Sequence, residues 1–434
     1  MRILQLTPGT GSFYCGSCLR DVALVRALRG RGHEATISPL YLPFALETEE
    51  DPSATEPVRM GGINVYLQQK APLMGRLPAW LTRWLDRPGL LRWASRRGSM
   101  TEPADLGEIT VSILRGEEGR QRAEIQRLVK ELGHEERPEV VVLSNVMLAG
   151  LVRPLAQELG VPVVVSLQGE QPFLDELPEP HRSHAWAELR ERCREVDAFL
   201  AVSDFTARLM ASRLELDPAR VHVVHNGIEL DDFRLTAPRG DRPPTIGYLA
   251  RMCADKGLPV LVEAYLELKR RSNLAGLRLD VCGVMLSEDR PLVDGLRARI
   301  DAEGHGGDVV FRPNVEREEK LHFLAGLDVL SVPATYGESF GLYVLEALAS
   351  GIPVVQPESG AFPELLEATG GGRLCSPDDP MSLADGLEEL LMNPEGARGL
   401  GARGREAVLA EFSADRMAER VEAILQTLGG AQVP

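Results

Sequence analysis

The sequence predicts an α/β protein of two Rossmann-like, doubly wound domains that face each other across a cleft. Short runs of β-branched residues alternate with helical patterns along the whole chain, which is typical of parallel sheets covered by helices on both faces. The chain has 434 residues, which is longer than a domain with a single hydrophobic core usually is. The alternation breaks at 238–244 (PRGDRPP) and then restarts. We therefore expect domains at 1–236 and 237–410, and a C-terminal helix at 411–434 that packs back on the first domain.

The first domain is expected to open with a strand at 2–8 (RILQLTP) that leads into a helix. Apolar residues from Leu19 to Leu28 recur at helical spacing, and Gly30 and Gly32 supply the stop signal. Further strands are expected at 34–41, 63–69, 139–144, 161–167, 197–202 and 221–224.

The second domain restarts with a strand at 245–250 (TIGYLA). Helices are expected to begin near Gly257, Arg317 and Leu342. Further strands are expected at 277–283, 308–311, 328–332 and 353–356. Ligands of doubly wound sheets bind outside the carboxyl ends of the strands, so we expect the site in the cleft between the domains.

Composition and charge exclude several functions. The net charge of -16 would repel a nucleic acid. The longest apolar stretch, 140–152, is interrupted by Ser144 and Asn145 and is shorter than the ~20 residues that span a bilayer. The N-terminus turns polar at Thr7, too early for a signal sequence. Six cysteines are too few for a disulfide scaffold, so we expect a cytoplasmic protein with reduced thiols.

The segment 336–351 (YGESFGLYVLEALASG) runs from a strand end through a glycine-bearing loop into a helix. Backbone N–H groups near Gly341 and Leu342 lie at the helix start, where they are expected to form an anion site. Glu338 on the loop and Glu346 on the helix can accept hydrogen bonds from sugar or ribose hydroxyls. The spacing alone also allows a solvated helix residue at 346 and a turn residue at 338.

The segment 247–258 (GYLARMCADKGL) also joins a strand end to a helix start. Arg251 can hold a diphosphate through its bidentate fork, and Lys256 can add a point charge. The alternative is two solvated cations, with a salt bridge to Asp255.

The first strand and first helix are joined by a glycine-bearing loop, 7–18 (TPGTGSFYCGSC). Tyr14 stands where a dinucleotide-binding motif requires its third glycine, so NAD binding is rejected. Gly11 and Gly16, like Gly9, leave room for the backbone to approach a ligand. Cys15 and Cys18 form a C-x-x-C before a helix, which leaves a redox role as an alternative. A zinc site would need two more ligands.

Taken together and in order, these segments resemble the retaining glycosyltransferases of glycosyltransferase family 4, which have the GT-B fold. The resemblance spans nearly the whole chain, and the E-x7-E of Glu338 and Glu346 is its most specific part. The matching segments are the glycine loop with RALRGRGHEATI, DAFLAVSDFTARLM, VHVVHNGIELDDF, IGYLARMCADKGL, GESFGLYVLEALASGIPVV, ESGAFPELL and the tail from SPDDPMSLADGLEELL to REAVLAEFS.

The resemblance implies a first, acceptor domain and a second domain that binds a nucleotide diphosphate sugar without a metal ion or other cofactor. Arg251 and Lys256 would hold the diphosphate, and Glu346 the ribose hydroxyls. Asn314 and Val315 would lie near the base, where FRPNV replaces a commoner glycine-x-valine turn. The donor sugar and phosphates would contact Glu338 and the backbone of Ser339, Phe340, Gly341 and Leu342. UDP-glucose is the expected donor, with GDP-mannose as the second choice.

The acceptor side departs from the family pattern. Gln168 stands where the family usually has a histidine, and a glutamine can bind a sugar hydroxyl but cannot change charge near neutral pH. Ser359 replaces a usual glycine in the ESGAFPE loop. The acceptor therefore stays open between a sugar, a lipid and a small molecule.

The segment 76–97 is basic and aromatic: Trp80, Trp84 and Trp93 alternate with arginines. Such a segment can lie on the inner face of an anionic membrane, as a peripheral contact, or form a lid over the acceptor. Pro78 interrupts a long helix, as does a second proline at 88, so we favour the lid.

A hexosyl transfer is the leading hypothesis. The alternatives are a nucleotide-sugar epimerase or a phosphorylase on the same fold, because fold does not fix function. An alternative from another functional class is a redox or regulatory protein that uses Cys15 and Cys18.

Overall fold

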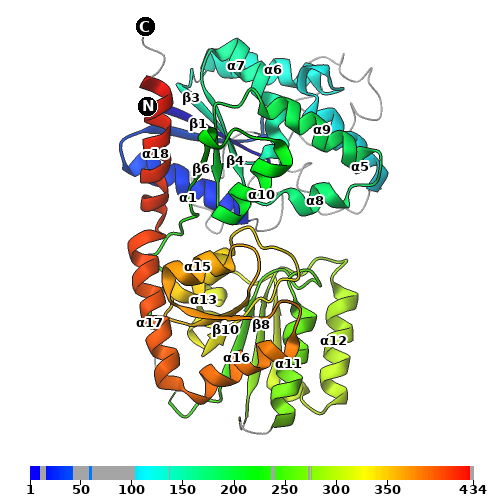
Figure 1. Cartoon of the computed structure of the whole chain (residues 1–434), viewed down its shortest axis with the longest axis vertical. Helices are drawn as coiled ribbons and strands as arrows, with labels where there is room; N and C mark the ends of the chain where they lie inside the picture. Colours follow the sequence, from blue (N-terminus) through cyan, green and yellow to red (C-terminus); the bar gives the residue numbers. More distant parts are fainter. Residues whose placement is uncertain are drawn as a thin grey trace. The chain divides into compact units, whose positions relative to one another are not determined.

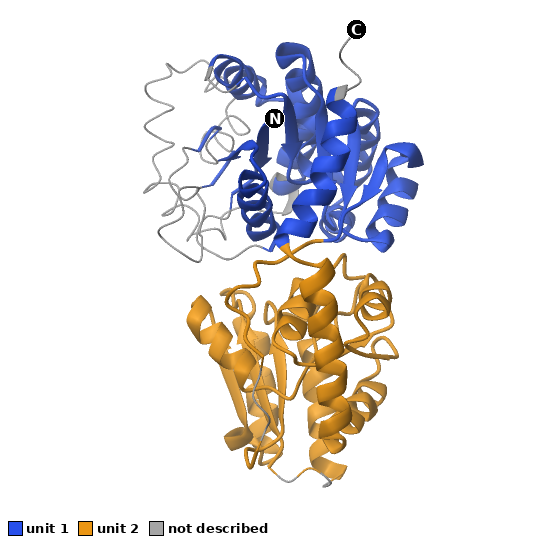
Figure 2. Cartoon of the chain, turned by 90° about the vertical axis from the view of Figure 1, so that its left-hand side faces the viewer, with its two compact units in different colours: residues 1–225, 414–434 blue, residues 226–413 orange. Residues whose placement is uncertain are grey.

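Each half of the chain folds around its own parallel sheet in the computed structural model (Figure 1). The structure describes residues 1–9, 16–42, 58–60, 103–135, 137–235, 240–271, 274 and 276–430. The chain divides into a first unit, Met1–His225 with Ala414–Pro434, and a second unit, Asn226–Ser413 (Figure 2). None of the described helices is both long enough and apolar enough to cross a membrane.

The first unit contains a six-stranded sheet with the order β2-β1-β3-β4-β5-β6, in which all pairs are parallel. Its strands are β1 (Arg2–Thr7), β2 (Glu34–Pro39), β3 (Val140–Leu143), β4 (Val163–Leu167), β5 (Ala198–Ala201) and β6 (Val221–Val223). Its α-helices are α1 (Gly16–Gly30), α5 (Pro103–Leu114), α6 (Arg122–Glu135), α7 (Val152–Leu159), α8 (Gln171–Glu176), α9 (His181–Cys193), α10 (Asp204–Leu214) and α18 (Ala414–Gly430).

Helices cover both faces of this sheet, which explains its valine-rich strands. Val141 of β3 belongs to one apolar cluster and its neighbour Val142 to another, because successive side chains of a strand point to opposite faces. The second cluster also contains residues of α1 and α18, which lie side by side (Figure 1). Met417 and Leu425 of α18 are buried there, so the last helix completes the first unit.

The second unit contains another parallel sheet, with the order β12-β11-β10-β7-β8-β9. Its strands are β7 (Thr245–Leu249), β8 (Arg278–Gly283), β9 (Val309–Pro313), β10 (Val329–Leu330), β11 (Val354–Pro357) and β12 (Gly372–Cys375). Its α-helices are α11 (Leu258–Arg271), α12 (Arg290–Ala302), α13 (Arg317–Ala325), α14 (Leu342–Ala349), α15 (Phe362–Thr369), α16 (Pro380–Met392) and α17 (Pro394–Glu411).

The predicted architecture of two doubly wound parallel sheets is confirmed. Two details differ from the sequence prediction. β12 was not predicted, because Arg373 and Leu374 of this short edge strand are exposed and it begins with glycine. The units divide after His225 rather than after 236, because Ile228 donates a backbone hydrogen bond to Phe412 at 3.0 Å within the second unit. The strand expected at 63–69 lies outside the described residues.

Candidate functional site

The site residues predicted for the second unit follow three strands of one sheet. Arg251 and Lys256 follow β7, Asn314 and Val315 follow β9, and Glu338 follows β10. β10, β7, β8 and β9 are consecutive in the sheet and run parallel. Because the carboxyl ends of parallel strands share one edge, the structure brings these residues to the same edge of the sheet.

Glu338 is a buried carboxylate shared by several donors. Only 5% of the residue is exposed. Its Oε2 accepts hydrogen bonds from Lys256 Nζ and from the Tyr343 hydroxyl, the latter at 2.9 Å. The Tyr336 hydroxyl lies 3.4 Å from the same oxygen. Glu338 is therefore a loop residue whose carboxylate is buried and paired.

Lys256 lies over two aromatic rings and is not a free loop cation. Its Nζ is 5.0 Å from the ring centroid of Tyr336 and 5.8 Å from that of Tyr343. Burial alone would lower the pKa of Lys256, but the negative charge of Glu338, with a smaller contribution from Tyr336, outweighs burial and raises it. A fixed positive charge therefore stands at the strand edge.

Arg251 is oriented by two carboxylates that the sequence did not predict. Its Nε and Nη2 donate to the two oxygens of Asp289, both at 2.9 Å, and Nη2 also pairs with Glu288. Asp289 is 5% exposed, whereas the Glu288 side chain is 69% exposed. The alternative of a salt bridge to Asp255 is wrong, because the loop after β8 supplies both partners.

Two glycines allow these loops to approach one another. Gly257 has φ +72°, and a Cβ there would lie 1.8 Å from the Pro333 carbonyl oxygen. Gly360 has φ +60°, and a Cβ there would lie 2.4 Å from the Glu338 backbone nitrogen. A side chain at either position would displace the loop beneath Lys256 and Glu338.

The helix α14 starts at this edge without a side-chain cap. Gly341 precedes it with φ +89° and makes no side-chain capping hydrogen bond. Phe340 is 2% exposed and anchors the preceding loop, whereas Ser339 and Leu342 are partly exposed. Val344 N–H donates to the Gly341 carbonyl at 2.9 Å, whereas the N–H groups of Leu342 and Tyr343 precede the first bond of the helix, so this helix start can hold an anion.

Glu346 lies on α14 and pairs with a lysine from α13. Its Oε1 is 3.0 Å from Lys320 Nζ, and the two side chains are 19% and 14% exposed. Glu346 is therefore an oriented, partly buried carboxylate, and the alternative of a solvated helix residue is wrong.

Asn314 adopts the left-handed backbone conformation at the end of β9. Its φ is +56°, which asparagine tolerates better than most residues. Its side-chain amide is already used: Oδ1 accepts from the Met285 backbone N–H at 3.0 Å, and Nδ2 donates to the Met285 carbonyl at 3.1 Å. Asn314 therefore fixes the loop after β8, and Val315, partly exposed, follows it.

In the first unit, Gln168 follows β4 and is held by a buried network. Its Nε2 donates to the Ser144 carbonyl at 2.5 Å. The Glu170 carboxylate accepts from the backbone N–H groups of Val146 and Gln168 at 3.0 Å and of Gly169 at 2.9 Å. Burial raises the pKa of Glu170, although these hydrogen bonds oppose the shift. The loop after β4 is thus fixed by Glu170, which the sequence reasoning missed.

The glycine loop of the first unit is described only in part. Gly16 is the first residue of α1 and is exposed, whereas Gly11 and Cys15 lie outside the described residues. Cys18 is 2% exposed, and its Sγ lies 3.4 Å from Thr7 Oγ1. The redox alternative therefore has no accessible thiol at position 18. The basic segment 76–97 also lies outside the described residues.

Two of the partners that orient the predicted residues were missed because they lie far away in the sequence. Asp289, which contacts Arg251, lies in the loop after β8. Lys320, which contacts Glu346, lies on α13. Tyr343 lies five residues after Glu338, and its place within the glycine-flanked segment was the available signal.

The printed sequence matches two family models that meet at residue 232. Residues 92–232 match "Glycosyltransferase Family 4", and residues 232–407 match "Glycosyl transferases group 1". A curated relative, the D-inositol 3-phosphate glycosyltransferase of Mycolicibacterium paratuberculosis, is 32% identical over 228 residues, which are 51% of this chain and 50% of that protein. The enzyme of the same name from Mycobacterium marinum is 30% identical, over 50% and 47% of the two chains. The chain thus spans about half the length of these relatives.

Solved structures show the same fold at low sequence identity. Sucrose-phosphate synthase from Thermosynechococcus elongatus matches with a TM-score of 0.72 and 16% identity over all of both chains. HepE of Anabaena, solved with UDP, matches with a TM-score of 0.71 and 16% identity over 99% of this chain and all of that chain. The two family models together cover 92–407 without a gap. The chain therefore belongs to the glycosyltransferase group 1 and family 4 proteins, with the GT-B fold.

Proposed function

We propose that this protein is a retaining hexosyltransferase that moves a sugar from a nucleotide diphosphate sugar to an acceptor. The observation that carries the proposal is the buried Glu338, which holds Lys256 at the strand edge where the uncapped helix α14 begins. Family membership and the UDP complexes of structural neighbours support it.

In the proposed reaction, the diphosphate leaves the sugar and gains negative charge. Lys256, Arg251 and the first-turn N–H groups of α14 neutralise that charge. Because Glu338 and Asp289 orient the two cations before the donor binds, little reorganisation accompanies the reaction. No step of this scheme needs a metal ion, so activity should survive a chelator such as EDTA. Loss of activity in EDTA that an added divalent ion restores would contradict the scheme.

Glu338 is proposed to bind the donor sugar, and Glu346 the ribose hydroxyls. The backbone from Ser339 to Leu342 is proposed to contact the sugar and phosphates, and Asn314 and Val315 to lie near the base. Because the Asn314 amide is used by Met285, recognition of the base there would fall to the backbone and to Val315. Gly11 and Gly16 of the first unit remain proposed contacts of the donor.

The acceptor is proposed to bind in the first unit, on the side of Gln168. Gln168 is proposed to bind an acceptor hydroxyl without acting as an acid or base. The curated relatives are named for D-inositol 3-phosphate, which makes a phosphorylated polyol one candidate acceptor for this chain.

The donor is tested first, by thermal shift with UDP, GDP and ADP sugars. A ligand at about 100 times its dissociation constant stabilises the fold by about 2.7 kcal/mol. We expect UDP-glucose to stabilise the protein most. Stabilisation by a GDP sugar alone would change the proposed donor, and no stabilisation by any of the three would contradict the proposal.

The epimerase alternative is tested with one nucleotide sugar and no acceptor. A new sugar isomer in the NMR spectrum would establish epimerisation. We expect none, and transfer only after an acceptor is added.

A further inference from the structure

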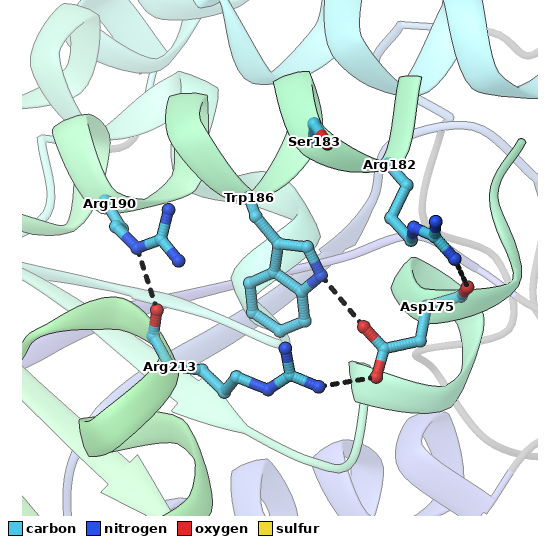
Figure 3. A pocket seen from close by; sticks show the side chains of 6 residues that line it. All are labelled: Asp175, Arg182, Ser183, Trp186, Arg190 and Arg213. Atoms are coloured by element: carbon cyan, nitrogen blue, oxygen red, sulfur yellow. Dashed lines mark hydrogen bonds and ion pairs between the residues drawn. The ribbon is translucent and has the colours of Figure 1, made fainter. Parts of the chain in front are cut away.

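The first unit contains a pocket that the proposed donor site does not use. Its volume is about 520 Å³, within the roughly 300–1,000 Å³ of small-molecule sites. Its lining residues come from α8, α9 and α10. These are the three helices that follow the loop at Gln168 in the chain (Figure 1). Its lining residues are Asp175, Arg182, Ser183, Trp186, Arg190 and Arg213 (Figure 3).

One wall of the pocket is fixed by hydrogen bonds. The Trp186 Nε1–H donates to Asp175 Oδ1 at 3.0 Å, and Arg213 Nη2 donates to Asp175 Oδ2 at 2.8 Å. The Arg213 guanidinium also stacks 5.2 Å from the centroid of the Trp186 ring, which is 5% exposed. Arg213 is therefore held in place before any ligand arrives.

Two guanidinium groups keep donors available. Arg190 uses Nε for the Arg213 carbonyl at 2.9 Å, and Arg213 uses Nη2 for Asp175. Within the described part of the chain, the two terminal amines of Arg190 and the Nε and Nη1 of Arg213 have no hydrogen-bond partner. Figure 3 shows Arg190 and Arg182 on opposite sides of Trp186, with Arg213 beside the ring.

Other carboxylates at the rim do not cancel these donors. Glu179 pairs with Arg182 at 2.8 Å, so Arg182 is the least available of the three arginines. Glu215 lies 3.5 Å from Arg190, but its side chain is 71% exposed and its charge is screened by water. The inference therefore rests on the open donors of Arg190 and Arg213, which come from two helices.

We propose that this pocket binds a phosphate monoester of a polyol or sugar. A tetrahedral dianion can accept hydrogen bonds from donors that approach from different directions, as Arg190 on α9 and Arg213 on α10 do. Asp175 accepts three side-chain hydrogen bonds, including one from Gln171, and a carboxylate offers about four acceptor positions. The remaining position, with the Ser183 hydroxyl, suits a polyol hydroxyl.

The bound phosphate ester has one of two roles: it is the acceptor of the sugar, or it is an effector. The pocket would recognise both through the same phosphate and hydroxyl groups. The acceptor interpretation rests on the proposed function, because it requires sugar transfer to the bound compound. Binding itself does not rest on it. Arg251 and Lys256 belong to the other unit, so substitutions there should leave binding in this pocket intact.

The test is calorimetry on the full chain with D-inositol 3-phosphate, unphosphorylated inositol and inorganic phosphate. We expect the phosphate ester to bind, inorganic phosphate to bind more weakly and inositol not to bind. Arg190→Gln, which keeps the wall of Asp175 and Trp186, should weaken phosphate binding at least about tenfold. Arg213→Lys keeps the positive charge but loses the planar guanidinium, so it should also weaken phosphate binding. Arg208→Gln, at an exposed position of α10 that does not line the pocket, is the matched control and should change nothing.

Affinity should also rise with pH across the second pKa of the phosphate, about 6. Glycosylation of the bound ester by wild-type protein would identify an acceptor, and binding without glycosylation an effector. The inference is overturned if D-inositol 3-phosphate does not bind, or if Arg190→Gln and Arg213→Lys bind it as tightly as Arg208→Gln. It is also overturned if Lys256→Ala abolishes the binding, because the ligand would then occupy the donor site. Intact phosphate binding in a protein that none of the UDP, GDP and ADP sugars stabilises would count against the proposed function alone.

Discussion

Glu288 and Asp289 hold the same guanidinium but are predicted to affect donor binding in opposite directions. Asp289 is buried and bidentate on the Nε and Nη2 of Arg251, so it fixes the guanidinium whose remaining donors a diphosphate needs. Glu288 is 69% exposed and pairs with one amine, so it competes with the diphosphate for that donor. We therefore expect Glu288→Gln to strengthen donor binding and Asp289→Asn to weaken it.

The magnitudes follow from exposure. An exposed ion pair contributes about 0–1 kcal/mol, so removing the competition of Glu288 should tighten binding by at most about fivefold. Breaking a buried pair costs about 3–5 kcal/mol, but the Arg251 side chain is 39% exposed, which reduces the loss. We expect Asp289→Asn to weaken nucleotide binding by about tenfold or more.

The assay is calorimetric titration of both variants with the nucleoside diphosphate that stabilises the wild type most. High salt should shrink the gain in Glu288→Gln, because exposed pairs are screened. Weaker binding in Glu288→Gln, or unchanged binding in Asp289→Asn, would refute the assignment of a competing and an orienting carboxylate.

Three further predictions concern the same unit. Glu346→Gln should weaken donor binding about ten- to a hundredfold, because charge-assisted hydrogen bonds are lost, and the loss should be much smaller for an analogue without ribose hydroxyls. Calorimetry checks this, with exposed Glu367→Gln as the control. If Glu346→Gln binds the donor as tightly as wild type, the role of Glu346 is structural. Tyr343→Phe should slow transfer about tenfold by removing one hydrogen bond to Glu338, and an unchanged rate would contradict that role. Gly257→Ala should lower the unfolding midpoint in urea, because its Cβ would meet the Pro333 carbonyl; an unchanged midpoint would contradict this.

The strands were predictable because both faces of a parallel sheet are buried. The run Val140–Leu143 is buried at every position, so its sequence has no polar interruption. β12 has the burial of an edge strand, and its short sequence carries no such signal. Local patterns thus predict the central strands better than the edges.

The site residues that lie together in one loop were predictable from the sequence. The contacts that tertiary packing makes between different loops were not. Glu338 and Lys256 each lie in a strand-to-helix loop with glycines, so their place at the sheet edge followed from the sequence. Their pairing joins two loops, and the Asp289 partner of Arg251 comes from a third. The pocket of Arg190 and Arg213 is assembled from three helices without any motif spacing, which is why only the structure shows it.

The most direct test of the proposed function is nucleotide binding by a pair of lysine variants. Lys256→Ala removes the cation at the strand edge, and Lys269→Ala removes a lysine of α11 that pairs with Asp308 at 2.8 Å away from the predicted residues. We expect the preferred nucleoside diphosphate among UDP, GDP and ADP to bind Lys256→Ala at least about tenfold more weakly than wild type, and Lys269→Ala equally well. Equal binding to both variants, or no binding of any of the three nucleotides to wild type, would contradict the proposed donor site.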